Sequence, residues 1–580
     1  MTMGGNNRRG WTLAVLLALG TAVLVCWSAL STPGAVVGSW QHPDNLSNHW
    51  LLVWVGERLL GGESLLHNDR YYWPVGDAPL LAGNGMEGLT YLPLHLLWGW
   101  PFAAVIWSAI AVAFNGLAAG ALARSAGAGW GGSWLAVAVV GWHPYVPHEL
   151  DMGHFSQADL GWLLLSLAAL TRLIRGGPTW WGAVAGACAA VAAALYWYHG
   201  VFFGLMALAL VAAGGWRAWR GLLLGAAVGA VLIAPWGWIS LDLLAEVPGV
   251  GEDAIFPHPH ARNAILEPGL PFGAQGTWQQ ARVLPLVVPV LALLGLGRER
   301  CGWALIVGLG VLLGLGPETP LYEVVYGWSA PMRRFWWPYR HGVLLLIGAS
   351  TLAALAIDRL PASNLVGLVL ALSVPGQLWL TGDLAQLAIS QGELPPAVYA
   401  ELAELPDGVV LEAPLAPEAS IATTMVAYQM WHGKTLLNGH APWVRRVRPV
   451  AWDAFIDANP FLRAITRWER GRGVAEVSTE GLAELRSQGL RWLVINPEHF
   501  HSRLKQLYRG WRNIGARLGG HPVLSADGLE VYDLSARPEV EVLELPAFRW
   551  PAKFPTSGPE HTPPGNALPS LIWHYDEEAP

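Results

Sequence analysis

Residues 11–30 read "WTLAVLLALGTAVLVCWSAL" and decide the fold class. The stretch carries no charged side chain over about 20 residues, the length that an α-helix needs to cross the hydrocarbon core of a bilayer. It is longer than the apolar core of a usual signal peptide, and its "VLVC" run lacks the small residue expected before a lipoprotein cysteine. We therefore expect a retained transmembrane helix.

The composition of the whole chain is that of an integral membrane protein. Of the 580 residues, 53% are hydrophobic and 13% are charged, whereas about a quarter of the residues of a soluble protein are charged. The 34 Trp residues agree with this class, because indole rings favour membrane interfaces. The net charge of −7 and the lack of a basic tract indicate no nucleic-acid partner. Cys26, Cys188 and Cys301 are scattered in or beside apolar segments, so they suggest packing rather than a disulfide framework.

Ten further apolar segments follow the first, which predicts eleven transmembrane spans and a mostly α-helical bundle. Most arginine clusters before the first span and between later ones fall on the same side if all eleven segments cross, whereas Arg333, Arg334 and Arg340 run against this trend. Since positive residues accumulate on the cytoplasmic side, the N-terminus is predicted inside and the C-terminus outside. The later segments are 101–123, 132–148, 158–174, 180–198, 200–214, 221–239, 283–297, 302–316, 341–357 and 362–380.

The first outer loop, residues 31–100, opens with "GSWQHPDNLSNHW" at 38–50. Asp44 stands there among histidines and asparagines, and the Leu and Trp positions of 45–60 suit a helix lying in the membrane interface. Two interpretations of Asp44 stay open. It begins an active site at the membrane face, or it caps the helix that follows.

Two more polar clusters lie at outer span ends. "HELDMGHFSQAD" carries Glu149, Asp151, His154 and Asp159, which are costly against lipid and should face a cavity, although a hydrated turn is the alternative. The histidines there lack the tight spacing of a zinc site. "PMRRFWWPYRHG" carries Arg333, Arg334 and Arg340. Arginine suits bidentate recognition of phosphate, whereas the neighbouring aromatic residues suit an interfacial belt.

The last 200 residues change in character, with more charge and with alternating elements. We expect strands at 408–415 and 490–497, helices at 417–432 and 498–515, and a hairpin at 521–534 around Asp527-Gly528. The domains are therefore a transmembrane core at 1–380, an extracytoplasmic α/β domain at 381–535 and a Pro-rich, poorly ordered tail at 536–580.

Five stretches, taken in this order, resemble a bacterial group of polytopic membrane proteins in the GT-C superfamily of glycosyltransferases. They are "HPDNLSNHW", "LLGGESLLHNDRYYWPVGD", "HPYVPHELDMGHFSQADLGWLLL", "PMRRFWWPYRHGVLLL" and "VVLEAPLAPEASIATTMVAYQMWHGKTLLNGHAP". The resemblance covers most of residues 38–442 and implies a GT-C-like core. The chain lacks a "WWDYG" stretch, which argues against the protein N-glycosylation of the oligosaccharyltransferase branch.

The resemblance implies transfer of a sugar from a polyprenyl-phosphate donor to an envelope glycan or lipid, in a bacterial plasma membrane. Asp44 would be the general base. Asp151, with Glu149 or Asp77, would bind acceptor or a divalent metal, beside His154. Arg333, Arg334 and Arg340 would hold the phosphate. The alternative is a non-catalytic membrane protein on the same fold, either a transporter or an envelope assembly factor.

Overall fold

The computed structural model describes residues 5–39, 43–65, 67–76, 78–79, 86–246, 284–297, 300–315, 319–320, 324–325, 338–390, 397–415, 419–439, 449–471, 476–500, 505–535 and 542–545. The chain forms two compact units. The first comprises Met1–Val410 and Pro417–Asp453, and the second comprises Leu411–Ala416 and Ala454–Pro580.

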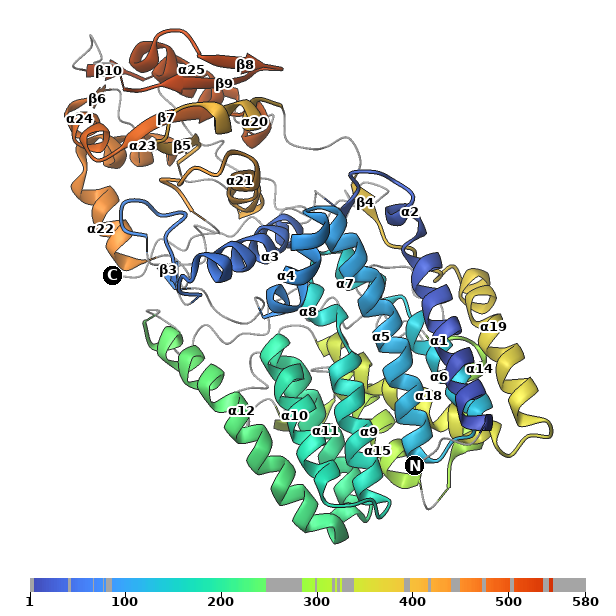
Figure 1. The fold of residues 1–580 in the computed structure, drawn as a ribbon. Coiled ribbons are helices and arrows are strands. Elements are labelled where there is room, and N and C mark those ends of the chain that lie inside the picture. Colours follow the sequence, from blue (N-terminus) through green and yellow to red (C-terminus); the bar gives the residue numbers. More distant parts are fainter. Residues whose placement is uncertain are drawn as a thin grey trace. The chain divides into compact units, whose positions relative to one another are not determined.

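The first unit is a bundle of long apolar helices that lie side by side (Figure 1). Five of its helical stretches are long and apolar enough to cross a membrane: Asn7–Val25, Phe102–Ala126, Phe155–Ile174, Gly215–Trp238 and Ser363–Thr381. A helix also lies in each of the other predicted segments. The polytopic helical fold is therefore confirmed, while the number of eleven crossings stays a prediction. The bundle helices are α1 (Gly5–Val25), α5 (Phe102–Ala126), α6 (Trp130–Gly141), α9 (Gly161–Ile174), α10 (Trp180–Leu195), α11 (Trp197–Ala212), α12 (Trp219–Glu246, after the 3₁₀ turn η1, Gly215–Ala218), α14 (Val287–Gly295), α15 (Cys301–Gly314), α18 (Gly342–Ile357, after η6, Pro338–His341) and α19 (Ser363–Thr381).

One predicted span, 132–148, is broken in the structure. Helix α6 ends at Gly141, and a separate short helix, α7, runs over Tyr145–Asp151. Pro144 precedes α7 and has no N–H to continue the hydrogen bonding of α6. The break turns the chain so that α7 and the next short helix, α8 (Phe155–Ala158), carry the acidic cluster at one end of the bundle.

Glycines let the bundle helices approach closely. A Cβ atom on Gly182 or Gly186 of α10 would meet the backbone carbonyls of Gly221 and Gly225 on α12. In the same way, Gly131 and its neighbour on α6 lie against the backbones of α19 and α18. Small residues at such contacts are typical of helices that pack within a membrane.

Polar contacts gather the arginine-bearing turns at one end of the bundle. Arg175 donates to the carbonyl oxygen of Ala126 at 2.8 Å, and Arg300 donates to that of Leu355 at 3.3 Å. Asp358 accepts the backbone N–H of Gly129. The turns after α5, α9, α14 and α18 therefore share one end, as the arginine pattern predicts, and the placement of this end in the cytoplasm stays a prediction.

The other end of the bundle carries residues 31–100, the predicted first outer loop. Helix α3 (Pro43–Gly61) lies across the bundle helices rather than among them (Figure 1), which agrees with the predicted interfacial helix. It packs against α4 (Glu87–Trp98) and α21 (Ala419–His432). The smaller elements of this region are α2 (Trp27–Leu30), β1 (Val36–Val37), β2 (His67–Asn68), β3 (Ala78–Pro79), β4 (Ile389–Ser390) and α20 (Ala397–Glu404); β1 pairs with β4 and β2 with β3, both antiparallel.

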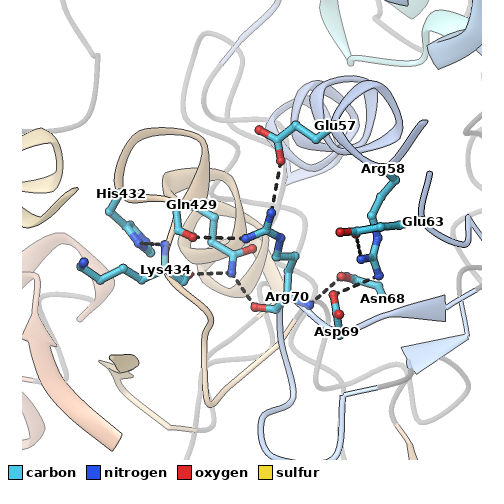
Figure 2. A network of polar contacts seen from close by, with 10 residues as sticks. Glu57, Arg58, Glu63, Asn68, Asp69, Arg70, Gln429, His432 and Lys434 are labelled. Carbon is cyan, nitrogen blue, oxygen red and sulfur yellow. Dashed lines mark hydrogen bonds and ion pairs between the residues drawn. The ribbon is translucent and has the colours of Figure 1, made fainter. Parts of the chain in front are cut away.

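Arg70 ties this loop to the segment after α21 (Figure 2). Its guanidinium lies 3.6 Å from the Glu57 carboxylate and also donates to the carbonyl oxygen of Gly433. Its backbone oxygen accepts the side-chain amide of Gln429 at 2.6 Å and the backbone N–H of Leu436 at 2.9 Å. Residues of the predicted outer domain are thus packed into the first unit.

A four-stranded sheet in the order β5-β7-β9-β8 belongs to the second unit except for Val409 and Val410, the first two residues of β5. The predicted strands appear as β5 (Val409–Ala413) and β7 (Leu490–Ile495), and the predicted hairpin as β8 (Leu524–Ala526) and β9 (Leu529–Asp533). Asp527 and Gly528 have φ of 51° and 84°, which are values of a tight hairpin turn. The other elements are α22 (Val450–Ala458), α23 (Pro460–Glu469), β6 (Glu476–Ser478), α24 (Glu480–Ser487), η7 (Pro497–His499), α25 (Lys505–Gly519) and β10 (Val542–Glu544).

The two units divide the chain differently from the predicted boundary at residue 381. Residues 381–410 and 417–453 belong to the first unit. Helix α21 packs against α3, and Leu436, which follows α21, donates its backbone N–H to the backbone oxygen of Arg70. In the predicted tail, β10 pairs with β6; the rest of the tail, apart from Leu545, lies outside the described residues. The extracytoplasmic placement of the second unit stays a prediction.

Candidate functional site

A buried acid–imidazole pair forms the centre of the candidate site. Glu149, on α7, has no exposed surface, and its Oε2 lies 2.7 Å from Nδ1 of His154. Burial alone raises the pKa of Glu149, yet the hydrogen bond and charge of His154, with Arg340 and His148, lower the pKa below the ordinary glutamate value. The Glu149 carboxylate is therefore held in its charged form inside the protein.

Arg340 supplies positive charge from the turn η6 that precedes α18. Its side chain is 9% exposed, and its Nη1 donates to the hydroxyl of Tyr196 at 2.8 Å. The guanidinium also lies over the ring of Tyr198, 5.4 Å from the centroid, a distance suited to a cation–π contact. Glu149 and Arg340, which the sequence places nearly 200 residues apart, thus belong to one cluster.

Two polar groups of this cluster lack partners among the described residues. Glu149 Oε1 is buried without a hydrogen bond. His199 is fully buried, its ring centroid lies 5.1 Å from that of Tyr196, and neither of its ring nitrogens has a hydrogen bond. Unsatisfied buried polar atoms cost about 1–3 kcal/mol each. They therefore indicate a place where water or a ligand completes the hydrogen bonding.

Asp151 lies at the end of α7 and joins it to the start of the outer loop. Its carboxylate accepts the backbone N–H of Ala388 at 2.7 Å, and its backbone oxygen accepts the N–H of Ser39 at 3.0 Å. Burial raises the pKa of Asp151 to about 7, partly offset by the bond from Ala388. A carboxyl group that titrates near neutrality can exchange a proton during a reaction.

The first turn of α3 adjoins this turn of the chain. Asp44 is the second residue of α3, and its neighbour Asn45 is fully buried, with its backbone against Gly153. Pro43 begins the helix, as proline often does, so Asp44 stands inside the first turn rather than at the capping position. The Asp44 side chain, Asp77, Arg333 and Arg334 lie outside the described residues.

Glu87 is a candidate that the sequence analysis missed. It lies in the first turn of α4, is 2% exposed, and its Oε2 has no hydrogen-bond partner among the described residues. Burial, reinforced by the charge of Asp159, raises the pKa of Glu87 well above its ordinary value. The one available signal was an acidic residue between glycines in an otherwise apolar outer segment. His199, in an apolar run at a span end, gave a similar signal.

Asp159, in contrast, has a local structural role. Its Oδ1 accepts the backbone N–H of Gly161 at 3.1 Å, where α9 begins. Within the described ranges, no three His, Cys, Asp or Glu side chains are grouped so that they could hold a metal ion. In the described residues, the cluster consists of the charged side chains of Glu149 and Arg340 with their partners His154 and Tyr196.

The fold is similar to that of a solved glycosyltransferase. Mycobacterial arabinofuranosyltransferase AftD matches 92% of this chain with a TM-score of 0.56 and 16% identity, and this chain spans 42% of the AftD chain. The Archaeoglobus fulgidus oligosaccharyltransferase matches 87% of this chain and 69% of its own, with a TM-score of 0.42 and 11% identity. ArnT from Cupriavidus metallidurans matches 91% of this chain over 98% of the ArnT chain, with a TM-score of 0.40 and 15% identity. No protein-family model and no curated protein sequence matches. This chain is a polytopic membrane protein with a GT-C-like fold.

Proposed function

We propose that the protein transfers a sugar from a polyprenyl-phosphate donor to an acceptor on the extracytoplasmic face of a bacterial plasma membrane. The observation that carries the proposal is the buried Glu149–His154–Arg340 cluster, next to the turn of α3 that bears Asp44. Charged groups buried at a span end are costly and are usually functional. The lipid anchor of such a donor would hold its phosphate near this depth.

The reaction makes one bond and breaks one bond. The acceptor hydroxyl oxygen attacks the anomeric carbon, and the bond from that carbon to the phosphate oxygen breaks, with inversion. The phosphate leaves with the bonding electrons, and the Asp44 carboxylate takes the proton of the acceptor hydroxyl. Positive charge near the phosphate stabilises the negative charge that develops on it.

Arg340 is proposed to supply part of that charge, together with Arg333 and Arg334. In the structure its guanidinium already binds Tyr196 and lies near Glu149. The negative charge of Glu149 therefore offsets part of the positive charge of Arg340. This offset is limited because Glu149 is also paired with His154. Asp151, with Glu149 or Asp77, is proposed to bind the acceptor or a divalent metal, and the acceptor is proposed to be an envelope glycan or lipid.

The binding test uses undecaprenyl phosphate and the full chain in nanodiscs. Arg340→Ala should weaken binding about ten- to a hundredfold, because a hydrogen bond to a charged group contributes roughly 1.5–3 kcal/mol. Arg340→Lys should recover part of the affinity. Tyr196→Phe is the matched control, since it removes only the hydroxyl that Arg340 binds. If Tyr196→Phe weakens binding as much as Arg340→Ala, Arg340 has a structural role.

The transfer test uses synthetic polyprenyl-phosphate sugars with pentofuranosyl and hexopyranosyl heads. The wild-type protein should release polyprenyl phosphate from one of them when membrane extract supplies the acceptor. Binding without release from any donor would favour the alternative of a transporter or an envelope assembly factor.

A further inference from the structure

A hollow lies between α3, α4 and α21. It has a volume of about 440 Å³, within the usual range of small-ligand sites. Its lining includes two tryptophans, one carboxylate and one imidazole: Trp100, Trp431, Glu57 and His95. None of these residues takes part in the site described above.

The two tryptophans form a fixed aromatic corner. Their rings lie 5.0 Å apart between centroids and are nearly perpendicular, at 88°. Trp100 Nε1 donates to Nδ1 of His49 at 3.1 Å, and His49 in turn contacts the backbone oxygen of Val37 at 2.9 Å. The orientation of Trp100 is therefore set by buried groups before any ligand arrives.

The polar groups of the hollow are close to neutral in sum. Glu57 is paired with Arg70 at 3.6 Å (Figure 2). Burial lowers the pKa of His95, against the opposing effect of Glu57, so its imidazole is uncharged at neutral pH. The Nδ1 atom of His95 is buried and has no hydrogen-bond partner among the described residues. The hollow thus offers acceptors and donors without a strong net charge.

The hollow also lies beside a surface suited to lipid. Leu96 and Leu97, at the end of α4, are 60% and 70% exposed, and Trp98 is 49% exposed. An exposed apolar patch of this kind is typical of a segment that meets the membrane interface. A ligand in the hollow would therefore sit next to the membrane surface.

We infer that this hollow binds a neutral sugar ring of the acceptor. A pyranose or furanose ring has C–H faces that pack on tryptophan rings and hydroxyls that bond to carboxylate and imidazole. A quaternary ammonium group also favours tryptophan and carboxylate, but the Arg70 charge beside Glu57 disfavours a cation. The identity of the ligand as acceptor rests on the proposed function, whereas binding of a saccharide does not.

The binding experiment uses saturation-transfer NMR on the full chain in nanodiscs. The probes are methyl glycosides of glucose, galactose, mannose and arabinofuranose, with choline as the competing class. We expect ring protons of at least one glycoside to receive saturation. Trp431→Ala should raise its Kd about tenfold or more, as expected when a central aromatic contact is lost. Trp98→Ala, which removes an exposed tryptophan of α4 outside the hollow, should leave the Kd unchanged.

Glu57→Ala is a second variant, because its exposed side chain can be removed without disturbing a buried core. It should also weaken glycoside binding. Arg340→Ala should lose undecaprenyl phosphate but keep the glycoside, so the two proposals fail separately. Glycoside binding without transfer from any lipid donor would end the proposed function and leave the saccharide site. No glycoside binding, binding unchanged by Trp431→Ala and Glu57→Ala, or binding of choline in place of a sugar would overturn the inference.

Discussion

Asp44, in the first turn of α3, has two possible roles that two substitutions separate. As a base, it must accept a proton, so Asp44→Asn should lower turnover by about 10² or more. As a charge at a helix N-terminus, it contributes about 0.3–1 kcal/mol, which is too little to change turnover. Sugar transfer and thermal unfolding should be measured on Asp44→Asn and Asp44→Ala at equal expression. An Asn variant with full activity would leave Asp44 only the helical role.

Asp151 should make stability depend on pH between about 4 and 7. Its pKa is about 7 in the folded protein, against an ordinary value of 3.8, so the folded state holds the proton more tightly. This contribution to stability is complete below about pH 4 and is lost as the pH rises through about 7. Asp151→Asn stays neutral and can still accept the Ala388 N–H, so it should lack this loss.

The measurement is the difference in unfolding temperature between Asp151→Asn and wild type across that range. As the pH rises, the variant should become more stable relative to wild type. The gain in the free energy of unfolding should be up to about 1.4 kcal/mol for each unit of difference in pKa. Groups common to both proteins cancel in the difference. Parallel curves would show that Asp151 titrates in its ordinary range.

The residue types of the site were readable from the sequence, but their contacts were not. Glu149, Asp151, His154 and Arg340 were predicted because charged residues at span ends are unusual. The pairing of Arg340 with Tyr196 depends on how α10, α11 and α18 pack, which no local pattern encodes. Glu87 and His199 were missed because single ionisable residues in apolar stretches carry no spacing signal.

At the scale of elements, the contact between α10 and α12 depends on glycine. Gly186→Ala places a Cβ against the carbonyl oxygen of Gly225, so the helices must separate. Overpacking of this kind costs about 1–3 kcal/mol. Gly204→Ala on α11 is the matched control, since a Cβ there has nothing within 4 Å. Thermal unfolding in detergent should show loss for the first variant and none for the second. Equal unfolding temperatures would mean that the two helices are less closely packed.

The elements themselves followed from hydrophobic pattern, and the errors have physical causes. Apolar length located the bundle helices, and β-branched runs located β5 and β7. The segment 132–148 was read as one span because its hydrophobicity continues through Pro144, whose missing N–H ends the helix all the same. The helix predicted at 498–515 begins later, at Lys505, because the 3₁₀ turn η7 (Pro497–His499) comes first.

At the scale of the whole molecule, the two ends of the bundle differ in chemistry. At one end, arginine side chains in the turns donate hydrogen bonds to backbone carbonyl oxygens of neighbouring turns. The other end carries Glu149, Tyr196 and Arg340. The sequence predicted this separation from charge alone. The two compact units divide the chain at residues other than 381, because Arg70 makes long-range contacts with residues 429–436.

The orientation of the bundle is the prediction on which the candidate site depends. If the arginine-bearing end is cytoplasmic, the second unit and Asp44 are expected on the extracytoplasmic side of the membrane. A reporter that is active only in the cytoplasm should be silent when fused after Tyr532 and active when fused after Arg175, in the turn that follows α9. A reporter that is active only outside should give the opposite pattern. Paired fusions control for expression, because each site is tested with both reporters. A cytoplasmic signal after Tyr532 with an outside signal after Arg175 would invert the bundle. It would place Glu149, Arg340 and Asp44 on the cytoplasmic side, and the proposed extracytoplasmic acceptor would then be excluded.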